Sequence, residues 1–172
     1  VGIGAFEDSV TNAAKGNNYG LEAEIDWSAT DDIRLFTAVG LLHASFDSYE
    51  NPRLVGIEDR RMAHAPAYTF TVGTEVAISP SLTFNANVEG KDEFYFSNSH
   101  NAESNSYALT NASLEYRTGD WTMTLWGRNL FDKEYATRGF FFGNNPAKGY
   151  VGENYIQLGD PHVVGLSLAW DY

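Results

Sequence analysis

Four segments of the chain alternate between apolar and polar residues. In residues 19–27 one face is apolar and the other acidic: Tyr19, Leu21, Ala23, Ile25 and Trp27 against Gly20, Glu22, Glu24 and Asp26. The same alternation recurs in residues 68–78, 82–96 and 164–172. A period of two is typical of a β-strand whose two faces meet different surroundings. These four segments are therefore predicted to be strands.

Three further segments show the same period more weakly, namely residues 33–47, 106–117 and 121–135. In residues 33–47 both the odd and the even positions are largely apolar, so the pattern leaves open which side chains share a face. Helical spacing at i, i+3 and i+4 is not sustained anywhere. The pattern predicts an all-β chain, arranged as an antiparallel meander of seven strands.

The connections between these strands alternate in length. Short turns rich in Ser, Asp, Thr, Pro and Gly lie at residues 28–32, 79–81 and 118–120, while long polar connections lie at about 49–66, 97–105 and 136–161. One end of the sheet should therefore carry tight turns and the other long loops. This asymmetry is typical of an outer-membrane barrel, with short periplasmic turns and long external loops.

Strand length and aromatic placement also favour a membrane barrel. The alternating runs exceed the usual strand of about 5–6 residues and suit the roughly 9–11 residues that cross hydrocarbon at a tilt. Aromatic residues stand towards the ends of the apolar faces, as interfacial girdles do: Tyr19, Trp27, Tyr68, Phe94, Phe96, Trp170 and Tyr172. Two alternatives stay open, a complete eight-stranded barrel of porin or adhesin type and a soluble β-sandwich binding module.

Composition narrows the function classes. The 172 residues suffice for one domain, and the net charge of −12 argues against nucleic-acid binding, because a phosphate backbone requires a basic face. The absence of cysteine excludes disulfide scaffolds, thiol catalysis and cysteine-based metal sites. No stretch approaches 18 apolar residues, so no transmembrane helix is predicted. The four histidines show no HExxH spacing and no G-x-S-x-G motif occurs, so neither a catalytic residue nor a metal site is predicted.

The C-terminal part of the chain carries the most specific motif. Residues 126–135 have the sequence WGRNLFDKEY, which resembles the NLFDKEY segment near the end of TonB-dependent outer-membrane receptors. Residues 18–24, NYGLEAE, resemble the family's G-hydrophobic-E-x-E strand. Residues 159–162, GDPH, followed by an alternating terminal strand, resemble the family's G-x-P-R segment, with His162 in place of the usual Arg. Together these motifs cover about residues 12–172 in the family's order.

The resemblance implies an uptake receptor and no enzyme. Residues 12–172 would be the C-terminal seven strands of a 22-stranded transmembrane barrel, and residues 1–11 the end of a preceding strand or loop. The chain is then expected to be a fragment of a longer receptor in the outer membrane of a Gram-negative bacterium. Its partners would be outer-membrane lipid and, through parts absent here, an N-terminal plug and a TonB-type energy-coupling protein. The solute would most commonly be a ferric siderophore or other iron chelate, and no cofactor is expected.

Two groups of residues in the long loops are candidates for solute binding, because aromatic rings and cations can hold a flat anionic chelate. The first group, in residues 136–161, comprises Arg138, Phe140, Phe141, Phe142, Tyr150 and Tyr155. The alternative is that the three phenylalanines anchor the loop or join the interfacial girdle. The second group, in residues 49–66, comprises Arg60, Arg61 and His64. Its alternative is loop solubility, or pairing with Glu58 and Asp59.

Charged residues on the polar faces of the strands should face the barrel lumen. The carboxylates are Glu22, Glu24, Asp26, Glu75, Glu89, Glu115 and Asp171, opposed by Lys91 and Arg128. Pairing with the absent plug is one interpretation. The favoured one is a hydrated wall, because a charge facing lipid at mid-depth costs a few kcal/mol. Trp126 alternates with Thr124 and Arg128 and should also point inward.

Overall fold

The computed structural model describes residues 15–48 and 60–171. The predictions for residues 1–11, for Glu58 and Asp59, and for Tyr172 lie outside these ranges. Within them the chain is almost entirely β-structure, with one short 3₁₀ helix, η1 (Pro146–Lys148). No helix in the described ranges is long and apolar enough to cross a membrane.

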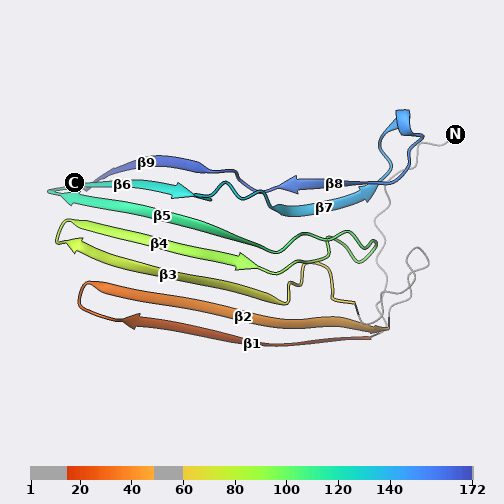
Figure 1. Cartoon of the computed structure of the whole chain (residues 1–172), viewed down its shortest axis with the longest axis horizontal. Helices are drawn as coiled ribbons and strands as arrows, with labels where there is room; N and C mark the ends of the chain where they lie inside the picture. Colours follow the sequence, from red (N-terminus) through yellow and green to blue (C-terminus); the bar gives the residue numbers. More distant parts are fainter. Residues whose placement is uncertain (1–14, 49–59, 172) are drawn as a thin grey trace.

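Seven strands form one antiparallel sheet in the order β1-β2-β3-β4-β5-β6-β9. Their bounds are β1 Lys15–Ser28, β2 Ile33–Ser48, β3 Tyr68–Ser79, β4 Leu82–Lys91, β5 Tyr107–Thr118, β6 Trp121–Arg128 and β9 Val163–Trp170. Two further strands, β7 (Ala136–Phe142) and β8 (Glu153–Leu158), form a separate hairpin that prolongs the line of β6 and β9 (Figure 1). The tight turns lie together at one end and the long connections at the other, as predicted (Figure 1).

The strand register sorts the side chains of the sheet into two faces. Leu21 lies opposite Leu41, Val72 opposite Val88, and Leu125 opposite Leu166, and residues opposite each other share a face. Following these pairs across the sheet collects the apolar set on one face, which we call the apolar face. The other, the polar face, carries Glu22, Glu24, Asp26, Glu75, Glu89, Glu115, Lys91 and Arg128. The prediction that these charges share one face is confirmed; Asp171 lies beyond the end of β9.

The register also settles the facing of β2. Ile33, Leu35, Thr37, Val39 and Leu41 pair with apolar-face residues of β1 and β3, so the odd positions belong to the apolar face. The even positions are apolar for a different reason. Ala44 and Phe46 are buried beneath the connection that follows β2, where the Met62 N–H donates to the Ala44 carbonyl.

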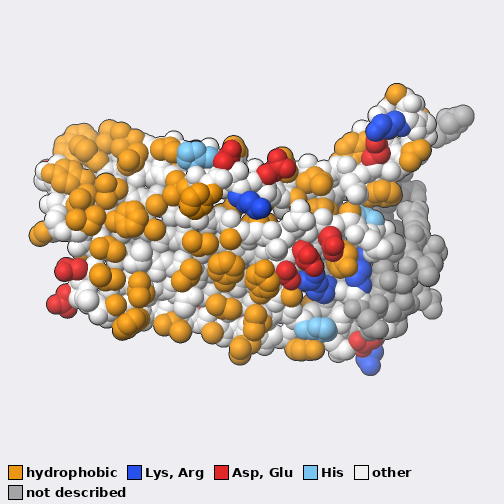
Figure 2. Space-filling model, viewed as in Figure 1, with side chains coloured by type: hydrophobic (Ala, Val, Ile, Leu, Met, Phe, Trp, Pro, Cys, Tyr) orange, Lys and Arg blue, Asp and Glu red, His pale blue; other side chains and the backbone are white. Residues whose placement is uncertain are grey.

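The apolar face is not a dry protein interior. Leu21, Val72 and Leu168 are 64%, 49% and 59% exposed, and hydrophobic side chains cover much of one face of the sheet in Figure 2. A β-sandwich would bury this face beneath a second sheet. In the described residues no second sheet covers it, which argues against the soluble module.

Two predicted strands end earlier than expected. The alternation in residues 82–96 continues past Lys91, but β4 ends there. Phe94 and Phe96 were predicted to lie in a lipid-facing girdle, which is wrong: they are 3% and 5% exposed and pack edge to face with ring centroids 5.7 Å apart. The predicted strand 121–135 likewise ends at Arg128, where Asn129 adopts a φ of 47° and turns the chain. Residues 136–161, predicted as a loop, contain the β7–β8 hairpin.

Trp126 lies on the polar face, as predicted, and explains a glycine on the neighbouring strand. Its indole Nε1–H donates to Ser167 Oγ at 3.0 Å, and its ring covers Gly165, where any Cβ would collide with it. The indole therefore fixes the β6–β9 pair by packing and by a hydrogen bond.

Candidate functional site

Tightly packed side chains gather at the end of the sheet that carries the long connections. Ala44, Phe46, Ala65, Phe94, Phe96 and Ser104 are all buried there. The connection before β3 and residues 92–106 after β4 are joined by backbone hydrogen bonds, such as His64 N–H to the Tyr95 carbonyl at 2.9 Å. These segments, which we call the loop platform (residues 60–67 and 92–106), form a rigid support for binding residues.

Arg60 and Arg61, predicted to bind solute, hold the two halves of the loop platform together. Arg60 donates to the carbonyls of Ser97 and His100 at 2.7 and 2.9 Å, and its guanidinium lies 4.1 Å from the centroid of the Tyr95 ring. Arg61 pairs with Asp92 at 2.8 Å and Glu93 at 3.0 Å. His64, with a φ of 57°, places its ring 5.5 Å from that of Phe94. A binding role for these three residues stays a prediction, and their observed contacts are within the loop platform.

Replacing Arg61 with Ala should loosen the loop platform. Its side chain is 24% exposed and that of Asp92 20%, and hydrogen bonds to charged groups contribute about 1.5–3 kcal/mol. We expect a loss of about 2 kcal/mol in the free energy of unfolding and faster proteolysis within residues 92–106. Arg117→Ala is the matched control, because Arg117 pairs with Glu115 while 70% exposed; it should cost less than about 1 kcal/mol. Equal losses in the two variants would contradict the assignment.

The β7–β8 hairpin brings most of the first candidate group together. Arg138, Phe140 and Phe142 alternate along one face of β7, where Tyr155 of β8 lies opposite Phe140. The Arg138 guanidinium lies 5.3 Å from the Phe140 ring centroid, and the Phe142 and Tyr155 rings stack at 4.7 Å. Tyr150 stands apart, 65% exposed, in the turn after η1. The result is an aromatic surface with an exposed cation.

Phe141 faces the other way and links the hairpin to the loop platform. The centroid of its ring lies 5.9 Å from that of the His100 ring. The backbone carbonyl of His100 accepts a hydrogen bond from Arg60. Phe96 packs against Gly139 so closely that a Cβ there would overlap its ring. The two candidate groups, separate in sequence, are thus connected through His100 and Phe96.

The His100 link should be sensitive to acid. Burial, and secondly the charge of Arg60, lower the pKa of His100 below its usual 6.5, and Nδ1 accepts the Ala102 N–H at 3.2 Å. A lowered pKa means that the unfolded chain binds the proton more readily, so stability is full above pH 6.5 and is lost as the pH falls towards the folded-state pKa. We expect the protection factors for hydrogen exchange in residues 92–106, which correct for the pH dependence of intrinsic exchange, to fall on acidification below pH 6.5. His100→Gln should flatten that dependence; an unchanged profile would contradict it.

A hollow lined by one cation and one carboxylate, Lys91 and Glu89, lies on the polar face beside the loop platform. Its volume is about 440 Å³, and Lys91, Tyr107 and Tyr135 contribute to its wall with Thr69, Thr71, Glu89 and Thr137. The Lys91 ammonium lies 5.0 and 5.3 Å from the ring centroids of Phe94 and Tyr107, and no ion pair to Lys91 is formed by the residues the structure describes. Tyr107 and Tyr135 approach to 4.5 Å between centroids. Rings around one cation suit a planar anion.

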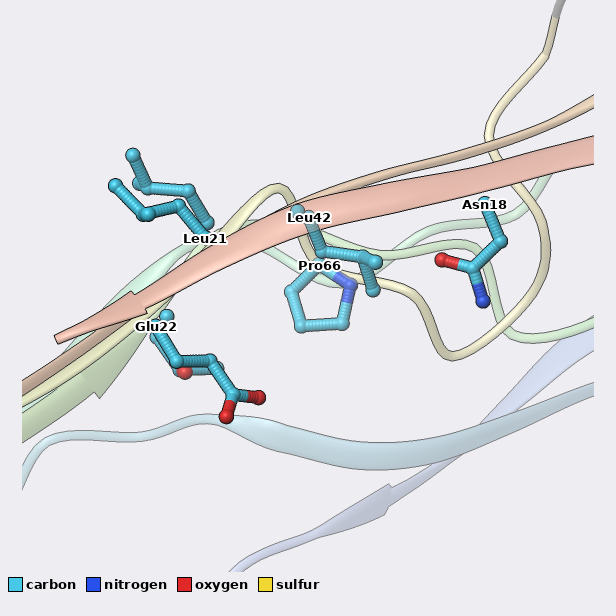
Figure 3. A pocket seen from close by; sticks show the side chains of 9 residues that line it. Asn18, Leu21, Glu22, Leu42 and Pro66 are labelled. Carbon is cyan, nitrogen blue, oxygen red and sulfur yellow. The ribbon is translucent and has the colours of Figure 1, made fainter.

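A larger hollow, of about 650 Å³, lies on β1 and β2 beneath Pro66. Figure 3 shows Asn18, Glu22 and Pro66 on one side of β1 and Leu21 on the other. Its polar groups are an amide, a hydroxyl and a carboxylate, from Asn18, Thr69 and Glu22. This hollow is lined by no cation, whereas the Lys91 hollow has Lys91 as well as Glu89, so the Lys91 hollow is the better candidate for an anion despite its smaller size.

Metal binding is not supported by the geometry of the described residues. Nowhere among them do three His, Asp or Glu side chains gather as metal ligands.

Comparison with known proteins adds to this geometry. The family model described as TonB dependent receptor-like, beta-barrel, matches residues 1–130. The chain belongs to this family. TonB-dependent receptors are transporters and not enzymes, in agreement with the prediction from the motifs.

Solved receptor structures share the fold. The siderophore receptor PiuA from Acinetobacter baumannii superposes with a TM-score of 0.73 at 18% identity, covering 91% of this chain and 22% of that one. The ferric yersiniabactin uptake receptor FyuA from Yersinia pestis gives 0.77 at 19% identity, covering 91% and 24%. The ferric-catecholate import receptor Fiu from K12 E. coli gives 0.66 at 18%, covering 90% and 20%. The chain therefore spans about a quarter or less of the length of these receptors.

Membership in the TonB-dependent receptor family favours the receptor barrel over the small porin or adhesin barrel. In membrane barrels the long connections are external and the short turns periplasmic. The loop platform, the β7–β8 hairpin and the Lys91 hollow lie at the end of the sheet that carries the long connections. Sequence analysis missed Tyr107 and Tyr135 as candidates, although both stand where an alternating segment meets a long connection.

Proposed function

We propose that this chain is the C-terminal part of an outer-membrane receptor that binds an anionic iron chelate, such as a ferric siderophore, for energy-coupled uptake. Its location would be the outer membrane of a Gram-negative bacterium. The plug and the TonB-type energy-coupling protein would act through parts of the receptor outside these 172 residues. Family membership supports receptor function in general, and structural neighbours are named as receptors for siderophores and ferric chelates.

The observation that carries the choice of an anionic solute is the placement of cations among aromatic rings at the external end. Lys91 stands between Phe94 and Tyr107, and Arg138 lies exposed against Phe140. The chain as a whole is acidic, with a net charge of −12. Cations that face solvent beside aromatic rings are therefore local exceptions to the overall charge, and they favour a flat ligand with negative charge.

Binding of iron chelates to the full-length receptor tests the proposal. We expect a panel of ferric catecholate, hydroxamate and citrate complexes to include at least one submicromolar ligand. Lys91→Ala and Arg138→Ala should each weaken its binding about 5-fold to 30-fold, the loss of about 1–2 kcal/mol that one cation–π and charge contact provides. Tyr150→Ala should weaken it less.

Arg34→Ala is the matched control, because Arg34 pairs with Asp26 at the periplasmic end and should leave affinity unchanged. Equal affinity in the wild type, Lys91→Ala and Arg138→Ala would show that the proposed contacts are wrong. A receptor that bound only metal-free or uncharged solutes would overturn the choice of an anionic chelate.

A further inference from the structure

In the turn between β6 and β7, residues 129–135, the side chain of Asn129 forms hydrogen bonds with several backbone groups. Asn129 is 3% exposed. Its side-chain amide donates to the carbonyls of Lys133 and Asp160 at 2.9 and 3.1 Å, and its Oδ1 accepts the Lys133 N–H at 2.8 Å. The backbone N–H of Asn129 donates to Asn111 Oδ1 at 3.1 Å. A single buried side chain thus satisfies backbone groups on both sides of the turn.

Two further backbone amides of the turn are also paired within the protein. Leu130 N–H donates to the Thr110 carbonyl, and Asp132 N–H to the Asn129 carbonyl, both at 2.9 Å. Asp132 Oδ1 accepts the His162 N–H at 2.9 Å. Irregular backbone exposed to water can use water as its partner, whereas hydrocarbon requires partners within the protein. The turn meets the stricter requirement at each of these positions.

The apolar side chains of the turn adjoin the apolar face of the sheet. Leu130 folds back over Gly127, where a Cβ would collide with its side chain, and Gly127 lies on the apolar face between Ala112 and Val164. Phe131 follows and is 80% exposed, more than any other large hydrophobic side chain in the described ranges. Val164 beside Gly127 is 58% exposed. Together Leu130, Phe131 and Val164 continue the apolar face.

Strand length explains why the sheet needs this continuation. The apolar band of a membrane barrel is about 25 Å tall, and its strands tilt by about 35–45°. At about 3.3 Å per residue and these tilts, the 12 residues of β3 cover about 28–32 Å of height. The 8 residues of β6 cover only about 19–22 Å, measured from Trp121 at the end of the sheet with the short turns. About 3–6 Å of the band beside β6 and β9 is left for another segment to cover.

We infer that Leu130 and Phe131, the first apolar side chains of the turn, contact acyl chains of the outer leaflet, whereas the exposed and charged Asp132, Lys133 and Glu134 that follow them do not. Lipid is the occupant because this surface is continuous with the apolar face of the barrel. The inference rests on the membrane placement within the proposed function, and it is independent of which solute the receptor binds. The turn therefore extends the membrane-facing surface beyond the last regular residue of β6.

Spin-label accessibility in the full-length receptor tests the inference. The 172 residues contain no cysteine, so Phe131→Cys, after replacement of any cysteine elsewhere, gives one labelling position in a receptor reconstituted into phospholipid vesicles. Leu125→Cys, on the apolar face of β6, is the lipid reference, and Tyr150→Cys, in the hairpin tip, is the water reference. We expect the Phe131 label to resemble the Leu125 label, with high collision rates for oxygen and low rates for a water-soluble nickel complex.

Each other outcome overturns the inference in a recognisable way. A nickel accessibility equal to that of the Tyr150 label would place Phe131 in water, and protection from both reagents would place it against protein. If the Leu125 label itself were accessible to nickel, the membrane placement in the proposed function would fail as well. Binding of the iron chelate by the Phe131→Cys receptor should equal wild type and shows that the labelled protein is folded.

Discussion

Replacing Asn129 with Ala is expected to destabilise the receptor by about 3–5 kcal/mol. The substitution removes three part-buried hydrogen bonds and leaves two carbonyls and one N–H without this partner, and each loss costs about 0.5–1.5 kcal/mol. The backbone at this position is left-handed, with a φ of 47°. Alanine, which lacks the local hydrogen bonds of asparagine, adopts this conformation at a cost of roughly 1 kcal/mol. Urea unfolding of the receptor in lipid vesicles, followed by tryptophan fluorescence, measures the loss.

Two further variants separate the causes. Asn129→Gly loses the same hydrogen bonds but tolerates the left-handed backbone, so its loss should be smaller by about 1 kcal/mol. Asn17→Ala is the matched control, because Asn17 is exposed and its amide donates only to Asp47; its loss should stay below about 1 kcal/mol. If Asn129→Ala were no more destabilising than Asn17→Ala, the central role of Asn129 in the turn would be wrong.

The sheet could be predicted from the sequence wherever its two faces differ chemically. In β1, exchanging the faces of Leu21 and Glu22 would place a carboxylate on the apolar face, so the pattern alone predicts which side chains share a face. For β2 the pattern was ambiguous, because Ala44 and Phe46 are apolar for contact with the loop platform rather than with lipid. Only the register against β1 and β3 separates these two reasons.

The early strand ends could not be predicted because alternation continues through them. Phe94 and Phe96 keep the spacing of β4 while packing into the loop platform, and the NLFDKEY motif keeps apolar residues at strand spacing although β6 ends just before the left-handed backbone of Asn129. The partners of Arg60 and Arg61 lie 31–41 residues away, so their contacts follow from tertiary structure. The hydrogen bonds of Asn129 to Lys133 and Asp160 also depend on the fold. The sequence predicted which end of the sheet carries the long connections, and the structure showed which side chains there contact one another.

A charge placed on the apolar face should be far more costly than the same charge one residue away. Val72 lies in the middle of β3, 49% exposed, opposite Val88 on the apolar face. We expect Val72→Arg to lower the free energy of unfolding in lipid vesicles by about 2–4 kcal/mol, the cost of Arg on the lipid face near the bilayer midplane. Less folded receptor should also accumulate in the outer membrane.

Thr71→Arg is the matched control for the same strand. Thr71 lies on the polar face opposite Glu89, which offers a carboxylate to the new cation, so we expect a loss of less than about 1 kcal/mol. Val and Thr are both β-branched and share the strand's backbone hydrogen bonding, and therefore strand propensity cannot produce a large difference between the two variants. A difference of about 2 kcal/mol or more between the two losses in the free energy of unfolding would indicate that one face of the sheet meets lipid and the other meets water. Equal losses would mean that the apolar face does not meet lipid, and the assignment of a membrane barrel wall to this sheet would fall.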